Sequence, residues 1–191
     1  MFEARWAAVA RLSALLPPRC ASLVLGRAVE LPPGPQALRL LAAVDPDSLE
    51  EGDRVELLLA WERCARWVEA QRARAVVAVA GPRPVDRDDF ARELVRVALV
   101  DCGGSARADV DLARALCGPL AVARAALERG EISYTHARIL SEETLPLDET
   151  AAAGVAQAVL GGGPRRSPAE FRRAVRRAVI AADPVRAELA A

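Results

Sequence analysis

The spacing of apolar residues predicts a chain built from helices. Apolar positions recur every three or four residues along most of the sequence, as on one face of a helix, and prolines or glycines separate these stretches. The longest stretch extends to about Ala80, where Gly81 and Pro82 end it. We place its apolar residues on one side as a core stripe, flanked by Trp61 and Trp67: Val55, Leu58, Leu59, Cys64, Ala65, Val68, Ala75, Val76 and Val79. The pattern predicts an all-α, multi-helix domain with one long helix.

Prolines set the predicted boundaries of this domain. Residues 1–44 are predicted to form a helical appendage with a proline-rich linker, because prolines at that density stop helices and strands. Residues 45–184 form the helical domain, and residues 185–191 form a short tail. Ser48 and Glu51 have the spacing of a capping box, which predicts that the long helix starts there.

The middle of the chain has the layout of a helix-turn-helix. A short helix runs into Asp101-Cys102-Gly103-Gly104, and Ser105 then caps a second helix that extends to Leu116. This second helix carries Arg107 and Arg114, which are candidates to lie near DNA bases. It also carries Asp109 and Asp111, so it is neutral where a DNA-reading helix gains from positive charge. A purely structural helical hairpin is the alternative interpretation.

The last predicted helix is the clearest candidate for a binding surface. Ser167, Pro168 and Glu170 give it a strong start, with a cap, a proline at the first position and a capping box. Phe171, Ala174, Val175, Ala178 and Val179 share one face, and arginines fill the opposite arc or precede the helix: Arg165, Arg166, Arg172, Arg173, Arg176 and Arg177. Such a helix can lie on a phosphate backbone. The alternative is a solvated face on a surface helix.

The charge is uneven along the chain, although 26 basic and 26 acidic residues cancel in total. Residues 1–44 carry a net +3 and residues 164–191 carry +4, whereas residues 45–163 are acidic. A nucleic-acid partner would therefore meet the ends. Every basic residue is arginine, which a genome of high GC content also explains, so richness in arginine is weak support on its own.

The inventory of reactive side chains excludes several enzyme classes. His136 is the single histidine, so neither a zinc protease pair nor a multi-histidine nuclease centre can be assembled. Cys20, Cys64, Cys102 and Cys117 have no CxxC spacing, which favours buried thiols in a reduced cytosol. No apolar run reaches the length of a membrane span. We predict a cytoplasmic protein with no catalytic residues, no metal, no cofactor and no membrane contact.

The segment around His136 offers no ordered catalytic group. Gly130 is predicted to close the preceding helix in the left-handed conformation, and Ser133 is predicted to begin the helix that carries His136. Ser133, Ser141, Glu142 and Glu143 lie nearby in sequence, but nothing arranges them as nucleophile, base and orienting group. Arg138 follows on the same predicted helix, so we expect His136 to make a nucleic-acid contact or a helix-capping hydrogen bond.

Three segments between about Leu38 and Pro184 carry a family resemblance: LAAVDPDSLEEGDRVELLLAWERCARWVEAQ, LARALCGPLAVARAALERGEISYTHARIL and SPAEFRRAVRRAV. The most specific run is GEISYTHAR at residues 130–138. Through these segments the sequence resembles the 13E12 repeat family, also catalogued as domain of unknown function 222. Members are high-GC bacterial proteins that commonly carry an HNH endonuclease domain behind this helical region. The HNH histidines are absent here, so the resemblance implies the accessory half of a nuclease-type protein or a copy without the nuclease.

A weaker resemblance connects the chain to the helix-turn-helix region of ParB-type partition proteins. There, a serine-capped recognition helix precedes a "G-x-[IL]-S-x-x-H-A-R" stretch and a later basic helix. The short turn and the acids at positions 109 and 111 depart from a good DNA reader. Likeness of fold does not fix function, but this resemblance favours DNA as a partner.

Together these features predict a non-catalytic DNA-binding module that positions an attached or separate nuclease. The predicted DNA contacts are Arg107, Arg114, His136, Arg138, Arg165, Arg166, Arg172, Arg173, Arg176 and Arg177. The alternative is a protein-interaction or oligomerisation module without a nucleic-acid role, in which the long helix and residues 1–44 pack against a partner.

Overall fold

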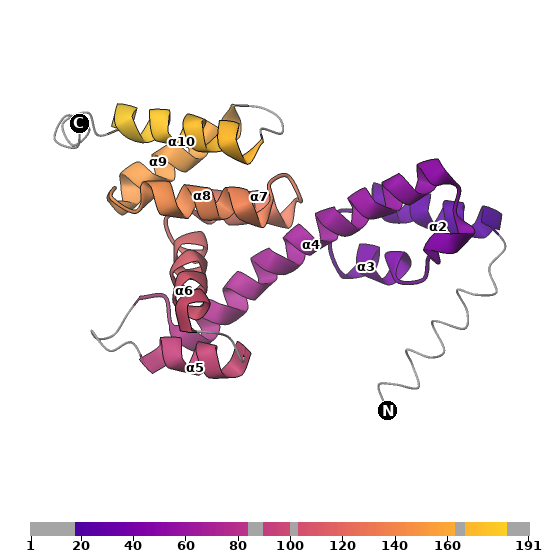
Figure 1. The fold of residues 1–191 in the computed structure, drawn as a ribbon, viewed down its shortest axis with the longest axis horizontal. Helices are drawn as coiled ribbons and strands as arrows, with labels where there is room; N and C mark the ends of the chain where they lie inside the picture. Colours follow the sequence, from indigo (N-terminus) through magenta and orange to yellow (C-terminus); the bar gives the residue numbers. More distant parts are fainter. Residues whose placement is uncertain (1–17, 84–89, 100–102, 163–166, 183–191) are drawn as a thin grey trace. The chain divides into compact units, whose positions relative to one another are not determined.

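The computed structural model describes residues 18–83, 90–99, 103–162 and 167–182, and these ranges are helical and contain no strand (Figure 1). The elements are α2 (Pro18–Glu30), α3 (Pro35–Leu41), the 3-10 turn η1 (Pro46–Ser48), α4 (Glu51–Ala80), α5 (Phe90–Leu99), α6 (Gly103–Cys117), α7 (Ala121–Glu128), α8 (Tyr134–Thr144), α9 (Glu149–Gly161) and α10 (Pro168–Ala182). The all-α prediction and its long helix are confirmed. The predicted N-terminal helix, Arg165, Arg166 and the tail at 185–191 lie outside the described residues.

The chain divides into two compact units within α4, after Val68. In the first unit, α2 and α3 share a core with the first half of α4: Ala21, Leu25, Ala28, Ala37, Leu41, Val44, Leu49, Leu57, Ala60 and Cys64. The Ser22 hydroxyl donates to Asp53 at 2.5 Å and Arg63 donates to the Val29 carbonyl at 3.1 Å, which fixes α2 along α4.

The predicted core stripe of the long helix is wrong for most of its residues. Cys64 and Val76 are buried as predicted, but the other seven are exposed: Val55, Leu58, Leu59, Ala65, Val68, Ala75 and Val79. Trp61 is also exposed, and Trp67 is half-buried. The reason is that α4 contributes to two cores, and each buries its own set of mostly small residues. These are Leu57, Ala60 and Cys64 in the first unit and Ala70, Ala73, Val76 and Ala80 in the second.

The second unit packs α5 to α10 and the second half of α4 around one core. Helix α10 lies against α8 and α9 (Figure 1) and buries Phe171, Ala174 and Val175, which confirms the apolar face predicted from its sequence. Helix α6 contacts α5 and buries Val110 and Leu116. The basic arc of α10 is thereby held at the surface of this unit.

Several helix starts and stops follow the sequence, but the predicted cap Ser105 is wrong: it lies inside α6, which already begins at Gly103. Ser133 caps α8, and Ser167 and Glu170 form the predicted capping box of α10, with the Ser167 amide 3.0 Å from the Glu170 carboxylate. Gly130 has φ 71°, the left-handed conformation predicted after α7. The Ser48 cap is wrong: its hydroxyl donates to the Asp45 carbonyl at 2.7 Å, because Asp45 caps η1 and α4 begins only at Glu51.

Candidate nucleic-acid interface

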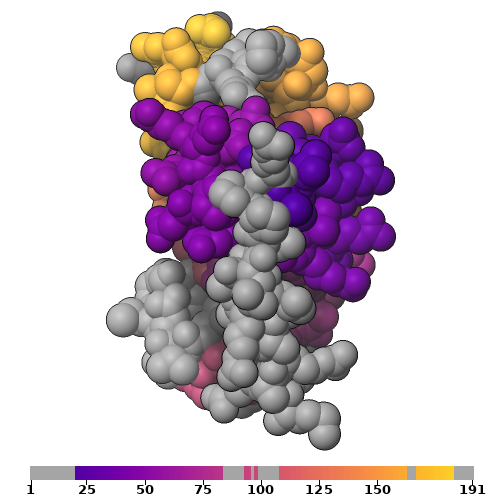
Figure 2. All heavy atoms as spheres, turned by 90° about the vertical axis from the view of Figure 1, so that its right-hand side faces the viewer, coloured from indigo at the N-terminus to yellow at the C-terminus, as the bar shows by residue number. Residues whose placement is uncertain are grey.

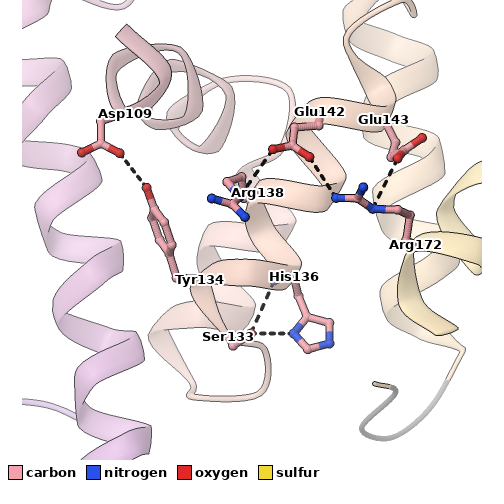
Figure 3. Close-up of polar contacts among 8 residues, drawn as sticks. All are labelled: Asp109, Ser133, Tyr134, His136, Arg138, Glu142, Glu143 and Arg172. Atoms are coloured by element: carbon pink, nitrogen blue, oxygen red, sulfur yellow. Dashed lines mark hydrogen bonds and ion pairs between the residues drawn. The ribbon is translucent and has the colours of Figure 1, made fainter. Parts of the chain in front are cut away.

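The four arginines of α10 form two pairs with different surroundings. Arg172 donates to Glu142 at 3.1 Å and lies 3.6 Å from Glu143. Arg176 donates to Glu143 at 2.9 Å, and this hydrogen bond raises the pKa of its guanidinium. Both glutamates belong to α8, some 30 residues earlier in the sequence (Figure 3). Half of the basic arc is therefore engaged with carboxylates of the same chain.

Arg138 joins this network from α8 itself. Its guanidinium lies 3.4 Å from Glu142, one turn further along the helix, so that Glu142 bridges Arg138 and Arg172 (Figure 3). We call Arg138, Glu142, Glu143, Arg172 and Arg176 the α8–α10 charge cluster. Its three cations and two carboxylates leave a formal charge of +1.

The other two arginines of α10 are exposed. Arg173 and Arg177 lie one helical turn apart, and neither makes an ion pair or hydrogen bond with any residue that the structure describes. At 100° per residue, both lie on the side of α10 opposite its buried residues Phe171 and Val175. This pair is the part of the predicted basic surface whose charge is not neutralised among the described residues.

His136 belongs to the start of α8. Its Nδ1 lies 2.6 Å from the hydroxyl of Ser133, the residue that caps the helix (Figure 3), and its ring packs edge-on against Phe171 with centroids 4.6 Å apart. The histidine thus links the first turn of α8 to the buried face of α10. The hydrogen bond to Ser133 matches the helix-capping alternative predicted for His136. The ring is half-buried and packs inside the second unit.

Arg114, predicted to lie near DNA bases, is buried. Its guanidinium donates to the Ala80 carbonyl at 2.7 Å and to the Gly81 carbonyl at 3.0 Å. These carbonyls end α4, where the helix has no further amides to bond them. Arg114 therefore holds the end of α4 against α6. The side chain of Arg107, the other predicted base contact, lies outside the described part of the chain.

Asp109, which weakened the DNA-reader interpretation, has an internal role. It accepts a hydrogen bond from Arg72 of α4 at 2.5 Å and another from the hydroxyl of Tyr134 at 2.7 Å. Burial would lower the pKa of Arg72, but the bond to Asp109 and its charge outweigh this and raise it. Burial, then the bond to Asp109 and its charge, raise the pKa of Tyr134 to about 12. The trio lines a small pocket together with Glu69 and Val76.

The remaining described surface of α6 offers no cation. Of its described side chains, at residues 108–117, the exposed ones are Ala108, Asp111 and Cys117. Sequence reasoning missed the Arg72, Asp109 and Tyr134 trio. The available signal was the position of Asp109 next to Val110 and one turn before Leu112 and Ala113, on the side of α6 that is buried.

Within the described ranges, no three histidine, cysteine, aspartate or glutamate side chains gather as a metal site. None of the helices in those ranges combines the length and low charge needed to cross a bilayer. The expectation of buried thiols is correct for Cys64 and wrong for Cys117, which is exposed. Comparisons of the chain with protein-family models, with curated proteins and with solved structures found no match.

Proposed function

We propose that this chain is a non-catalytic DNA-binding module that meets the phosphate backbone with the exposed side of α10. The observation that supports this is the pair Arg173 and Arg177, exposed and without partners among the described residues. Arginine is well suited to phosphate, because its guanidinium presents several donors in a fixed plane. By the family resemblance, the module would position an attached or separate HNH nuclease.

The proposed contact surface is smaller than the sequence suggested. Arg173 and Arg177 are its centre, and Arg172, Arg176 and Arg138 lie beside them in the α8–α10 charge cluster. Arg165 and Arg166 precede α10 in the sequence and stay in the proposal as predicted contacts. We leave Arg114 and His136 out of the surface, because the first is buried under α4 and the second packs against Phe171.

Replacing Arg173 and Arg177 together by alanine is expected to weaken binding to a labelled duplex about tenfold at low salt. Two lost phosphate contacts also reduce the slope of log affinity against log salt by about 1.8. The measurement is a fluorescence anisotropy titration over a range of salt concentrations.

The matched control is Arg74→Ala with Arg83→Ala, which removes two exposed arginines from the same unit outside α10. An equal loss in both double variants would reduce the effect to total charge and refute the contact surface. Wild-type protein that binds no duplex even at low salt would refute the proposed function.

The exposed apolar side of α4 supports a second candidate function, a protein-interaction or oligomerisation module. Val55, Leu58 and Leu59 are 57%, 63% and 50% exposed in the first unit, at the three- and four-residue spacing of one helix face. Figure 2 turns this end of α4, in purple, toward the viewer. Apolar groups gathered on a surface mark contact sites more often than scattered ones do.

If copies of the chain associate through this side of α4, Leu58→Glu is expected to shift the protein to monomer, because the partner would bury a charge. Light scattering over a wide concentration range measures this. Leu145→Glu, at a leucine 82% exposed at the end of α8, should leave the mass unchanged. A wild-type chain that is monomeric at every concentration would exclude self-association.

A further inference from the structure

The two glutamates of the α8–α10 charge cluster are placed differently. Glu142 has a side chain 49% exposed, and it lies between Arg138 at 3.4 Å and Arg172 at 3.1 Å. Glu143 is only 16% exposed and contacts both Arg172 and Arg176. Glu142 thus stands between two guanidinium groups, and Glu143 anchors Arg172 to α8 (Figure 3). Glu143 anchors Arg176 as well.

We propose that Glu142 occupies a phosphate site formed by Arg138 and Arg172, and that a backbone phosphate of DNA replaces its carboxylate there. A carboxylate and a phosphate diester present similar oxygen pairs to a guanidinium, so the same two arginines can bind either. Displacement costs little, because ion pairs between exposed side chains are weak in water. This inference rests on the proposed DNA-binding function and assigns Glu142 as the residue that limits its affinity.

Glu143 has the opposite role in this arrangement. Its contacts orient the side chains of Arg172 and Arg176 where α10 packs against α8. Because Glu143 is little exposed, a ligand at the surface does not reach it. It is a positioning residue. Removing its charge frees the two arginines to move, whereas removing the charge of Glu142 opens the site without disturbing that anchor.

The test compares Glu142→Gln with Glu149→Gln in the complete chain, using anisotropy of a labelled duplex across a salt series. Glu149 is 71% exposed and lies 3.6 Å from Arg83, so its variant makes the same charge change at another exposed ion pair of the unit. We expect Glu142→Gln to bind roughly two to five times tighter than wild type, because no ion pair has to be broken before the phosphate binds. The salt slope should change little, since the same phosphate is contacted in both proteins. We expect Glu149→Gln to differ little from wild type. Adding Arg138→Gln to Glu142→Gln should remove the gain.

The outcomes separate the two proposals. If wild type binds and Glu142→Gln gains no more than Glu149→Gln, the phosphate site is refuted while DNA binding stands. If Glu142→Gln binds and wild type does not, the site is supported and the function proposed for the unmodified chain is refuted. Binding by neither refutes both. A parallel titration with inorganic phosphate separates the sources of the ligand: saturation at low millimolar concentration would assign the site to a free phosphate and overturn its assignment to the DNA backbone.

Discussion

Arg114→Met is expected to destabilise the second unit by about 3 kcal/mol. Methionine keeps most of the length of the side chain but removes the donors that bind the carbonyls of Ala80 and Gly81. A hydrogen bond from a charged donor contributes about 1.5–3 kcal/mol, and an acceptor left buried without a partner adds a desolvation cost. The lost cation also faced the negative end of the α4 dipole, where positive charge is stabilising.

Urea denaturation followed by circular dichroism measures this change, with Arg74→Met as the matched control. Arg74 is exposed and donates an exposed hydrogen bond to Gln71 of the same helix, so its loss should change the free energy of unfolding by less than about 0.5 kcal/mol. Equal curves for Arg114→Met and wild type would show that the buried guanidinium is not needed to end α4. They would also return Arg114 to the candidates for a DNA contact.

Local sequence patterns predicted the parts of this fold that depend on neighbours within one turn. The capping box of Ser167 and Glu170, the serine cap of α8 and the left-handed glycine after α7 are all contacts over three or four residues. The apolar face of α10 was also predictable, because a single core receives it and Phe171, Ala174 and Val175 are all buried there. In these places, the amino acid and its neighbours determine the geometry.

The buried residues of α4 could not be predicted in this way, because the helix carries more apolar residues than the two cores bury. Leu58 and Leu59 fit a helical spacing as well as Leu57 does, and periodicity gives no reason to choose the leucine that is in fact buried. Small residues such as Ala70 and Ala73 fill the second core, although an apolar scale ranks them below the exposed leucines. Which residues of α4 are buried depends on where α2, α3 and α6 pack against it, and the sequence of α4 alone does not contain that information.

In the candidate site, the sequence likewise did not predict which arginines form ion pairs. In the sequence, Arg172, Arg173, Arg176 and Arg177 are four equivalent cations on one helix. The fold brings Glu142 and Glu143 to one side of α10, so that two of the four are paired and two are not. Likewise, Arg114 meets carbonyls 33 and 34 positions earlier. Spacing within a helix predicts which side chains share a face, but not which of them the rest of the chain neutralises.

Asp109→Ala is expected to destabilise the second unit by about 3 kcal/mol. The side chain of Asp109 is 13% exposed and accepts from both Arg72 and Tyr134, so its removal leaves two donors without their acceptor. Breaking a buried ion pair costs about 3–5 kcal/mol, and the lower end applies because Arg72 is 35% exposed and water reaches it. Asp111→Ala, at an exposed carboxylate of the same helix, is the control for denaturation and should change stability far less.

The same variant has a spectroscopic signature, because Tyr134 is the single tyrosine of the chain. Its pKa in the fold is about 12, above the ordinary 10.0, through burial first and then the hydrogen bond and charge of Asp109. The unfolded chain ionises near pH 10, so the stabilisation is complete below that pH and is lost as the pH rises toward 12. In Asp109→Ala the hydrogen bond and charge of Asp109 are lost, while burial and the charge of Glu69 still raise the pKa of Tyr134. Tyrosinate absorbance should therefore develop at a midpoint between 10 and 12, and the stability advantage of wild type should shrink across that interval. A wild-type midpoint near 10 would mean that Tyr134 is not held against Asp109 in solution, and α6 would then need another tether to α8.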